Sequence, residues 1–362
     1  MRKQSILYKT LARALSVKRP HGGAGVTMFE QWLYDRIPAG FDKFFDSCGN
    51  LHVDARITAD HKTLFVAHID TVHKGDGPNK IRKTHGTWYA DGAPLGADDG
   101  AGVAMLMHLM HNSVPGYYIF TQGEECGGIG AKYVAKHYAE LLAQFDRAIA
   151  FDRRGLDSVI THQGWGRCAS DAFGDALANA LNTADATLMY LPDDTGVYTD
   201  TAEFVDIIPE CTNISVGYYS EHSENERLDI FHYIALSQAV LLVDWDNLPT
   251  ERDPSVPDPE PGYSLTGVTS SWRSAFAWDA TDDDWEREYL QDAIYDAQVG
   301  LTDDLIELMC ESVYPEDPRL AARFVNPKLL TDQLLEEALY NSRVYDTDTV
   351  LCTLFDAIHC EA

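Results

Sequence analysis

The stretch KTLFVAHID (residues 62–70) is a short apolar run that ends in polar side chains. Its length and its apolar content are typical of a buried β-strand. His68 ends the run, so its ring is expected at the carboxyl edge of the sheet, where α/β folds bind their ligands. Asp70 follows on the same side of an extended chain. Its carboxylate can accept the second ring N–H of His68 and so fix the tautomer.

The segments around this strand alternate between strand-like and helix-like patterns. The expected strands are 51–57, 62–70, 116–123, 147–152 and 211–219, and the expected helices are 27–37, 99–112, 128–145, 170–182 and 230–248. Thr27 and Glu30 form a potential capping box for the first of these helices, and Ser170 is a potential cap for the fourth. This alternation predicts an α/β fold, a three-layer sandwich with a mixed, largely parallel sheet.

A change of composition marks a second part of the chain. Residues 250–264 (TERDPSVPDPEPGYS) are rich in proline and acidic residues, which is typical of a semi-rigid linker. We therefore expect a catalytic domain over 1–249 and a small C-terminal helical module over 265–362. Helical patterns in the module cover 282–298, 303–314, 326–342 and 347–359. The module contains no catalytic constellation, so covering the cleft, assembly and partner binding all remain open as its role.

Charge and cysteine usage exclude several classes of partner. The chain has 57 acidic and 28 basic residues, a formal net charge of −29, so its surface repels nucleic acid and anionic lipid. Its seven cysteines form no Cys-x-x-Cys pair, which indicates reduced thiols in a cytoplasmic protein. The basic segment 1–20 lacks a signal-peptide cleavage site and is expected to form an amphipathic helix capped by Ser5.

Polar clusters follow five successive strand ends: AHID (67–70), GADDGAG (96–102), GEECGG (123–128), FDRRG (151–155) and YYSEHSENE (218–226). Histidine nitrogen and carboxylate oxygen are the ligands that zinc takes in such sites, and two ions need a bridging carboxylate. Adjacent carboxylates, as in Asp98–Asp99, are costly unless a cation meets them.

Individual roles in this set are partly open from the residues alone. Of Glu124 and Glu125, one can bind metal while the other takes the proton of a water. Asp152 ends a strand, and His222 can close a second metal site. His73 and His162 are candidates to line the cleft.

The order of AHIDTV, DGAPLGADDGAG, GEECGGIGA, FDRRG and EHSENE resembles the co-catalytic dinuclear zinc exopeptidase clan. This clan includes the peptidase T and carboxypeptidase G group and the bacterial leucyl aminopeptidases. The resemblance covers roughly residues 25–245. It implies that His68 and Asp152 bind one Zn²⁺, that Glu125 and His222 bind a second, and that Asp98 bridges them. It also implies a general base in Glu124, an orienting role for Asp70 and a peptide bond between Asp98 and Asp99 that is often cis. Co²⁺ or Mn²⁺ can replace zinc in such sites.

The sequence departs from many relatives in one respect. Only about 70 residues separate Asp152 from His222, too few for the inserted lid or dimerisation domain that those relatives carry. Any substrate-binding groups that such a lid supplies must therefore be absent here or come from elsewhere in the chain.

The leading functional hypothesis is a metal-dependent exopeptidase, either an aminopeptidase or a di/tripeptidase, with a short peptide as substrate. An acidic pocket would favour a free amino terminus, and the candidate acids for it are Asp193, Asp194 and Asp200. Alternatively, a substrate carboxylate could bind to Arg153 and Arg154, or these arginines could neutralise the acids of the metal site. One alternative is an amidohydrolase that acts on small N-acyl amino acids. Another is a non-catalytic metal-binding scaffold that presents its C-terminal helices to a partner. Homo-oligomerisation is compatible with each.

Overall fold

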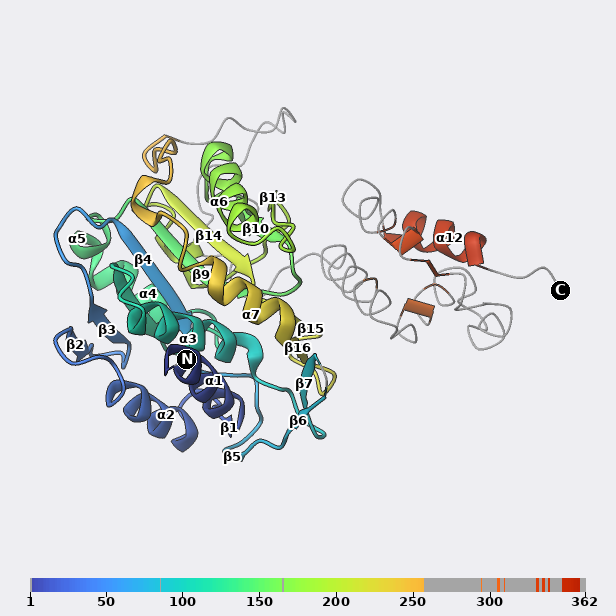
Figure 1. Cartoon of the computed structure of the whole chain (residues 1–362), viewed down its shortest axis with the longest axis horizontal. Coiled ribbons are helices and arrows are strands. Elements are labelled where there is room, and N and C mark those ends of the chain that lie inside the picture. Colours follow the sequence, from blue (N-terminus) through green and yellow to red (C-terminus); the bar gives the residue numbers. More distant parts are fainter. Residues whose placement is uncertain are drawn as a thin grey trace, which may run out of the picture. The chain divides into compact units, whose positions relative to one another are not determined.

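The computed structural model describes residues 2–84, 86–164 and 166–256, together with 294, 305–306, 309, 330–331, 334–335, 338 and 347–358 (Figure 1). Two compact units divide the chain, Met1–Asp258 and Pro259–Ala362. Among the described residues, no helix has both the length and the apolar character needed to cross a membrane.

An eight-stranded mixed sheet forms the centre of the first unit, in the order β13-β10-β14-β9-β4-β8-β3-β2. The four central strands β14, β9, β4 and β8 run parallel, whereas β3 and β2 are antiparallel at one edge and β10 is antiparallel to β14. A second sheet has the order β15-β16-β7-β6. The predicted mixed, largely parallel sheet is confirmed.

The strands of the first unit are β1 Val17–Lys18, β2 Asp42–Phe45, β3 Leu51–Asp54, β4 Thr63–His68, β5 Gly77–Pro78, β6 Ile81–Lys83, β7 Thr87–Ala90, β8 Tyr117–Thr121, β9 Arg147–Arg153, β10 Ser158–Ile160, β11 His162–Gln163, β12 Gly166–Arg167, β13 Leu191–Asp193, β14 Glu210–Ser215, β15 Tyr218–Tyr219 and β16 Arg227–Asp229. Its helices are α1 Arg2–Leu15, α2 Ala24–Tyr34, α3 Ala97–His111, α4 Ile129–His137, α5 Ala139–Leu142, α6 Asp171–Ala184 and α7 Ile230–Ala239, with short 3₁₀ helices η1 Asp200–Phe204 and η2 Trp245–Asn247.

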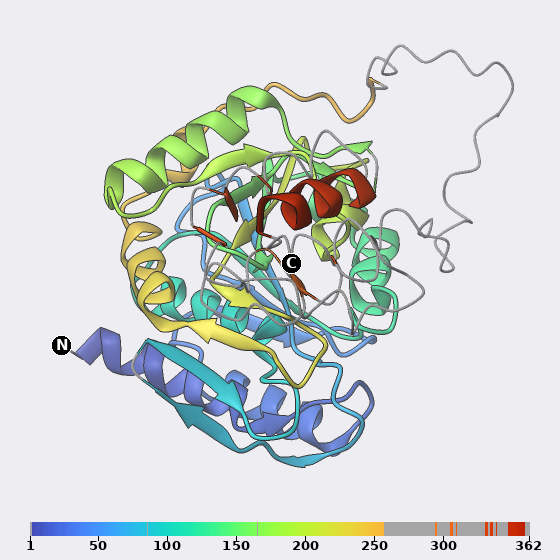
Figure 2. The ribbon, with the colours of Figure 1, turned by 90° about the vertical axis from the view of Figure 1, so that its right-hand side faces the viewer.

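Alternating side chains of each central strand serve two separate cores. Phe65 and Ala67 of β4 belong to a core shared with α1, α2, α3, α6 and α7. Leu64 and Val66 of the same strand belong to a core shared with α4, α5 and η1. Because side chains of a strand point to opposite faces in turn, the two cores define a three-layer sandwich. Figure 2 shows α1 and α2, in dark blue, at the opposite end of the unit from α6, in light green.

Two of the three expected helix caps are wrong. Helix α2 begins at Ala24 rather than after Thr27, because Asp76 accepts hydrogen bonds from the backbone N–H groups of Ala24 and Gly25. A side chain fifty residues away thus does what the capping box was expected to do. Helix α1 begins at Arg2, so Ser5 lies within it. The cap by Ser170 is confirmed, since its hydroxyl accepts from the N–H of Phe173 at the start of α6.

Two expected elements are each divided. The helix expected over 128–145 is interrupted at Tyr138, whose ring packs against His52 and Phe44 of the neighbouring strands. The strand expected over 211–219 ends at Ser215, and Gly217 takes a positive φ of 97°. This turn passes the chain to β15 of the second sheet. Both breaks follow from tertiary packing that local periodicity does not contain.

The second unit is described only in part. Helix α12, Thr347–Ile358, lies where the pattern over 347–359 predicts a helix. Val350, Leu351, Leu354 and Phe355 on this helix are buried together with Ile294, Leu305, Met309, Leu335 and Ala338. Most of the other predicted helical segments lie outside the described residues.

The first unit extends past residue 249, where the linker was expected to begin. The backbone N–H groups of Glu251 and Arg252 both donate to Glu210, a fully buried carboxylate. The guanidinium of Arg252 donates to the carbonyls of Val205 and Pro209. The first residues of the expected linker therefore belong to the packed domain.

We expect two truncations to differ sharply. A chain ending at Asp258 keeps these contacts and should unfold cooperatively. A chain ending at Leu248 leaves buried Glu210 without two donors and should lose about 3 kcal/mol of unfolding free energy, because unsatisfied buried groups cost about 1–3 kcal/mol each. Urea unfolding of the two fragments measures the difference. Equal midpoints would show that residues 249–258 add nothing to the domain.

Candidate metal centre

The carboxyl ends of the four central parallel strands carry the predicted site. His68 is the last residue of β4, and Glu124 and Glu125 follow β8. Asp152 lies near the end of β9, and the loop with His222 follows β14 and β15. Because parallel strands place their carboxyl ends at one edge, segments far apart in sequence meet there.

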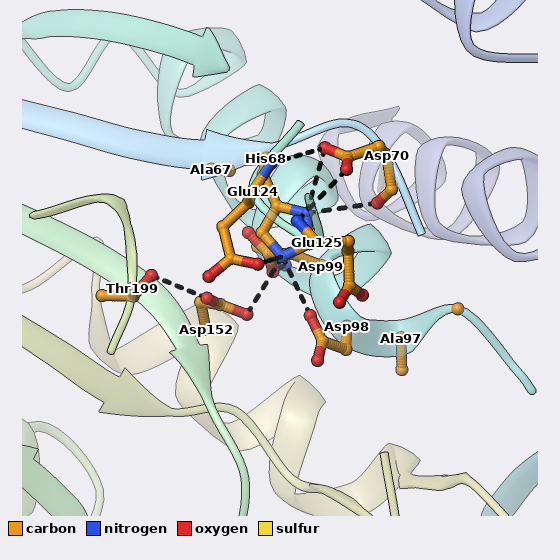
Figure 3. A network of polar contacts seen from close by, with 12 residues as sticks. Ala67, His68, Asp70, Ala97, Asp98, Asp99, Glu124, Glu125, Asp152 and Thr199 are labelled. Atoms are coloured by element: carbon orange, nitrogen blue, oxygen red, sulfur yellow. Dashed lines mark hydrogen bonds and ion pairs between the residues drawn. The ribbon is translucent and has the colours of Figure 1, made fainter. Parts of the chain in front are cut away.

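Three side chains form a first potential metal-binding group: His68, Asp98 and Asp152. Nε2 of His68 lies 2.9 Å from Oδ1 of Asp98 and 3.6 Å from Oδ1 of Asp152. Figure 3 shows both carboxylates, and that of Glu124, converging on this nitrogen. All three members are buried.

A second group consists of Asp98, Glu125 and His222. Nε2 of His222 lies 3.1 Å from Oδ2 of Asp98 and 3.3 Å from Oε2 of Glu125. Asp98 thus offers one oxygen to each group. The peptide bond between Asp98 and Asp99 is cis. The five residues thus form two histidine–carboxylate groups that have Asp98 in common.

Glu124 belongs to neither group but borders the first. Its Oε2 lies 3.8 Å from Nε2 of His68. Burial, together with the negative charges of Asp152, Asp200 and Asp98, raises the pKa of Glu124 well above its ordinary value. A carboxylate with an elevated pKa close to a metal centre is suited to accept and return a proton.

Asp70 holds the loop that carries both glutamates. Its carboxylate accepts hydrogen bonds from the backbone N–H groups of Gly123, Glu124 and Glu125. Nδ1 of His68 donates to the backbone carbonyl of Asp70 at 3.1 Å, whereas the carboxylate lies 3.7 Å away. The ring N–H of His68 thus bonds to the main-chain carbonyl of Asp70, while the carboxylate of Asp70 stays within ion-pair distance of the same nitrogen.

Glu226 supports the backbone that leads into Asp98, and sequence reasoning gave it no role. This buried carboxylate accepts from the N–H groups of Gly96, Ala97 and Asp98. Burial and the charge of Asp98 raise the pKa of Glu226 to about 8. Its only signal in the sequence was its place in the cluster 218–226.

Two hydroxyl groups, also missed, hold Asp152. Thr199 donates to Oδ2 at 2.7 Å, and the phenol of Tyr218 donates to Oδ1 at 3.2 Å. Thr199 precedes η1, whose first residue, Asp200, is buried and accepts from Thr121. No short motif marks either hydroxyl, because both reach Asp152 only through folding.

The other charged residues proposed from the sequence do not all lie near the two metal-binding groups. Asp193 accepts from Ser158 and Thr195 as part of the fold, and Asp194 is exposed. Only Asp200 of the three acidic residues lies near the centre, since its charge acts on Glu124. Arg153 donates to Thr195, and Arg154 pairs with Glu221 at 3.4 Å. His162 lies in the short β11–β12 ladder.

The donor set fits divalent cations. The carboxylates raise the pKa of His68 well above its ordinary value, although burial alone would lower it. Oε1 of Glu125 is buried and has no hydrogen-bond partner among the described residues. Buried carboxylates at this density are unfavourable without compensating positive charge. Two histidines with shared carboxylates match the ligands that zinc prefers.

The fold and the site together define a metallopeptidase of the co-catalytic exopeptidase clan. The family model described as "Peptidase family M28" matches residues 50–233, slightly more than half of the chain. The chain belongs to peptidase family M28 and is accordingly a zinc metallopeptidase. Among curated proteins, no sequence matches the chain.

Solved structures show the same fold at low identity. Aminopeptidase PepT from Bacillus cereus is 15% identical with a TM-score of 0.54, over 67% of this chain and 98% of that one. A tripeptidase from Staphylococcus aureus is 18% identical with a TM-score of 0.53, over 66% and 96%. The Pyrococcus horikoshii TET1 peptidase, described as assembling into a tetrahedron or an octahedral shell, is 17% identical with a TM-score of 0.50, over 65% and 98%.

Proposed function

We propose that the chain is an aminopeptidase of short peptides that uses two zinc ions. The observation that carries this proposal is the pair of histidine–carboxylate groups that share Asp98, with Glu124 beside them. His68, Asp98 and Asp152 would hold one ion, and Asp98, Glu125 and His222 the other. When bound, two such ions supply Lewis-acid chemistry that acidifies a water and polarises the scissile carbonyl.

Side chains of the protein carry out the proton transfers and hold the base in place. Glu124 accepts the proton of the attacking water as the oxygen adds to the carbonyl carbon. The same carboxyl group returns the proton to the amine nitrogen as the C–N bond breaks, which leaves a carboxylic acid and a free amine. Asp70 keeps Glu124 in place through the loop N–H groups. The three hydrogen bonds that Asp70 accepts from this loop limit the movement of Glu124 between the two proton transfers.

Preference for a free amino terminus follows from the charge of the site. Asp200 is buried, and its Oδ1 has no partner among the described residues. Burial and neighbouring acids raise the pKa of Asp200 to about 7. An ammonium group beside Asp200 and Glu124 would relieve the repulsion between these acids, so the site favours a substrate with a free amino terminus. Arg154 pairs with Glu221 and Arg153 donates to Thr195, so both arginines already have partners within the protein.

We expect the purified full chain to lose activity on chelation and to regain it with Zn²⁺. Alanine p-nitroanilide should be hydrolysed at least about 10-fold faster, in kcat/KM, than its N-acetyl derivative, because acetylation removes a charge-assisted interaction of about 1.5–3 kcal/mol. A preference for the N-acetyl substrate would instead support an amidohydrolase. Failure to cleave either substrate with both metals bound would leave a non-catalytic scaffold.

We further propose that the protein acts in the cytoplasm. Cys48, Cys126, Cys168 and Cys211, the cysteines whose side chains the structure describes, are all free thiols, which suits a reducing compartment. A homo-oligomer and a separate role for the C-terminal helical module remain predictions.

A further inference from the structure

A pocket of about 370 Å³ adjoins the metal centre at His222. One wall is formed by His73 and Lys74, which follow β4, and another by residues 92–94. Lys18 of β1 and Glu224, two residues after His222, complete the lining. Because His222 belongs to both the pocket and the metal-binding set, a peptide cut at the centre would extend into this space. The volume suits a group of amino-acid size.

The pocket is lined by two positively charged side chains, Lys18 and Lys74, which is unusual in so acidic a protein. Lys18 is half-buried and Lys74 is exposed, and neither forms an ion pair with a residue that the structure describes. By contrast, Arg154 pairs with Glu221, and Arg82 pairs with Asp91 at 2.8 Å. The single acidic side chain of the lining, Glu224, is exposed. Two lysines without acidic partners thus line the pocket next to the candidate metal centre.

His73 also lines the pocket, and both nitrogens of its ring are held by hydrogen bonds within the protein. Its Nδ1 accepts from the hydroxyl of Thr71 at 2.7 Å, and its Nε2 donates to the carbonyl of Pro94 at 2.9 Å. Burial first, and then the charges of Arg19 and Lys18, lower the pKa of His73 to about 4. Both ring nitrogens therefore serve the fold, and the ammonium groups are the available donors.

We infer that the Lys18–Lys74 pocket binds a carboxylate of the substrate. This inference rests on the proposed peptidase function and assigns its substrates to short peptides with a negative charge near the scissile bond. The carboxylate has two possible sources, an Asp or Glu side chain and the C-terminus of a di- or tripeptide. In either case the acidic centre attracts the amino end and the lysines attract the carboxylate, so the peptide is held by both of its charges.

The test compares matched peptides by kcat/KM on the zinc-loaded full chain. One pair is Ala-Ala-Ala and its C-terminal amide. The other pairs exchange Glu for Gln at the first or second position of amidated tripeptides. We expect at least one acid to exceed its neutral partner about 10-fold, as a charge-assisted interaction at a partly exposed site allows. The pair that shows the preference identifies the source of the carboxylate.

Variants locate the effect in the pocket. In Lys18→Met/Lys74→Met, the ratio of acid to neutral peptide should fall to about one, and in Glu224→Gln it should rise, since a repelling charge is removed. Lys136→Met, which removes an exposed lysine of α4 that does not line the pocket, should leave the ratio unchanged. The ratio should also fall with added salt, because exposed charges are screened.

Two further results separate this inference from the proposed function. If neutral peptides are cleaved but no acid is preferred, or if the double variant keeps the preference, the carboxylate pocket is wrong and the peptidase stands. If no peptide is cleaved, the proposed function is wrong. Calorimetric binding of the free-acid and amide tripeptides to the same proteins then decides the pocket. Selective binding of the acid that the double variant loses supports the pocket, and equal or absent binding overturns it.

Discussion

Glu124→Gln should reduce kcat by about 10²–10⁴-fold while both metal-binding groups remain intact, because general-base contributions usually have this size. Glutamine keeps the length and hydrogen-bonding shape of the side chain but cannot accept the proton. Glu124 lies beside the first group at 3.8 Å from His68 and is not a member of either group. Elemental analysis should therefore find the metal content of the wild type.

Comparison of kcat with KM tests whether Glu124 acts only in the transition state. Loss of a group that acts only in the transition state should lower kcat and kcat/KM together, with KM nearly unchanged. Glu140→Gln is a suitable control, because Glu140 is exposed on α5 and the same change of charge is made there. Turnover of Glu124→Gln close to that of the wild type, with metals in place, would contradict the proposed mechanism.

Asp98→Asn should have the largest effect on metal content. Asp98 offers one oxygen to each group, so a single substitution weakens both sets of ligands. We expect metal content to fall from about two ions to fewer than one per chain, since a bridging carboxylate serves both ions of such a site. Hydrolysis should fall by about 10³-fold or more, because metal-ion catalysis contributes several kcal/mol.

The control for this variant is Asp91→Asn, an exposed aspartate that pairs with Arg82 and belongs to neither metal-binding group. It should retain metals and activity. Circular dichroism of both variants tests whether the fold survives. A folded Asp98→Asn protein that still carries two tightly bound ions would show that Asp98 does not bridge them.

Local sequence patterns predicted the layers of the fold because its central strands are short apolar runs. Residues 63–68 of β4 are all buried. A short apolar run of this kind predicts a buried strand from the local sequence alone. The cap at Ser170 was also predictable, because an N-cap bonds to a backbone group three residues away. Both features depend on interactions within a few residues.

The ligand residues were predictable for a different reason. Polar side chains that end apolar strands must gather at one edge of a parallel sheet, so their order along the chain already indicates a common site. His68, Glu125 and Asp152 lie at or just after the ends of strands of the central sheet in this way, whereas Asp98 lies at the start of α3 and His222 follows β15 of the second sheet. The choice of Glu125 rather than Glu124, and of Asp98 rather than Asp99, came from the resemblance to the zinc exopeptidases.

Contacts between distant segments were decided only by the tertiary structure. Asp76 caps α2, Glu226 holds the backbone before Asp98, and Thr199 holds Asp152, each across at least 47 residues. The same is true of the carboxylate of Asp70, which accepts from the loop N–H groups while lying 3.7 Å from the His68 ring.

The Lys18–Lys74 pocket likewise combines β1 with the segment that follows β4. None of these pairings has a spacing rule, because each depends on how loops from separate strands pack. The sequence by itself determined which chemical groups reach the edge of the sheet, and the packing of the loops determined which of them support the ligands and which face the substrate.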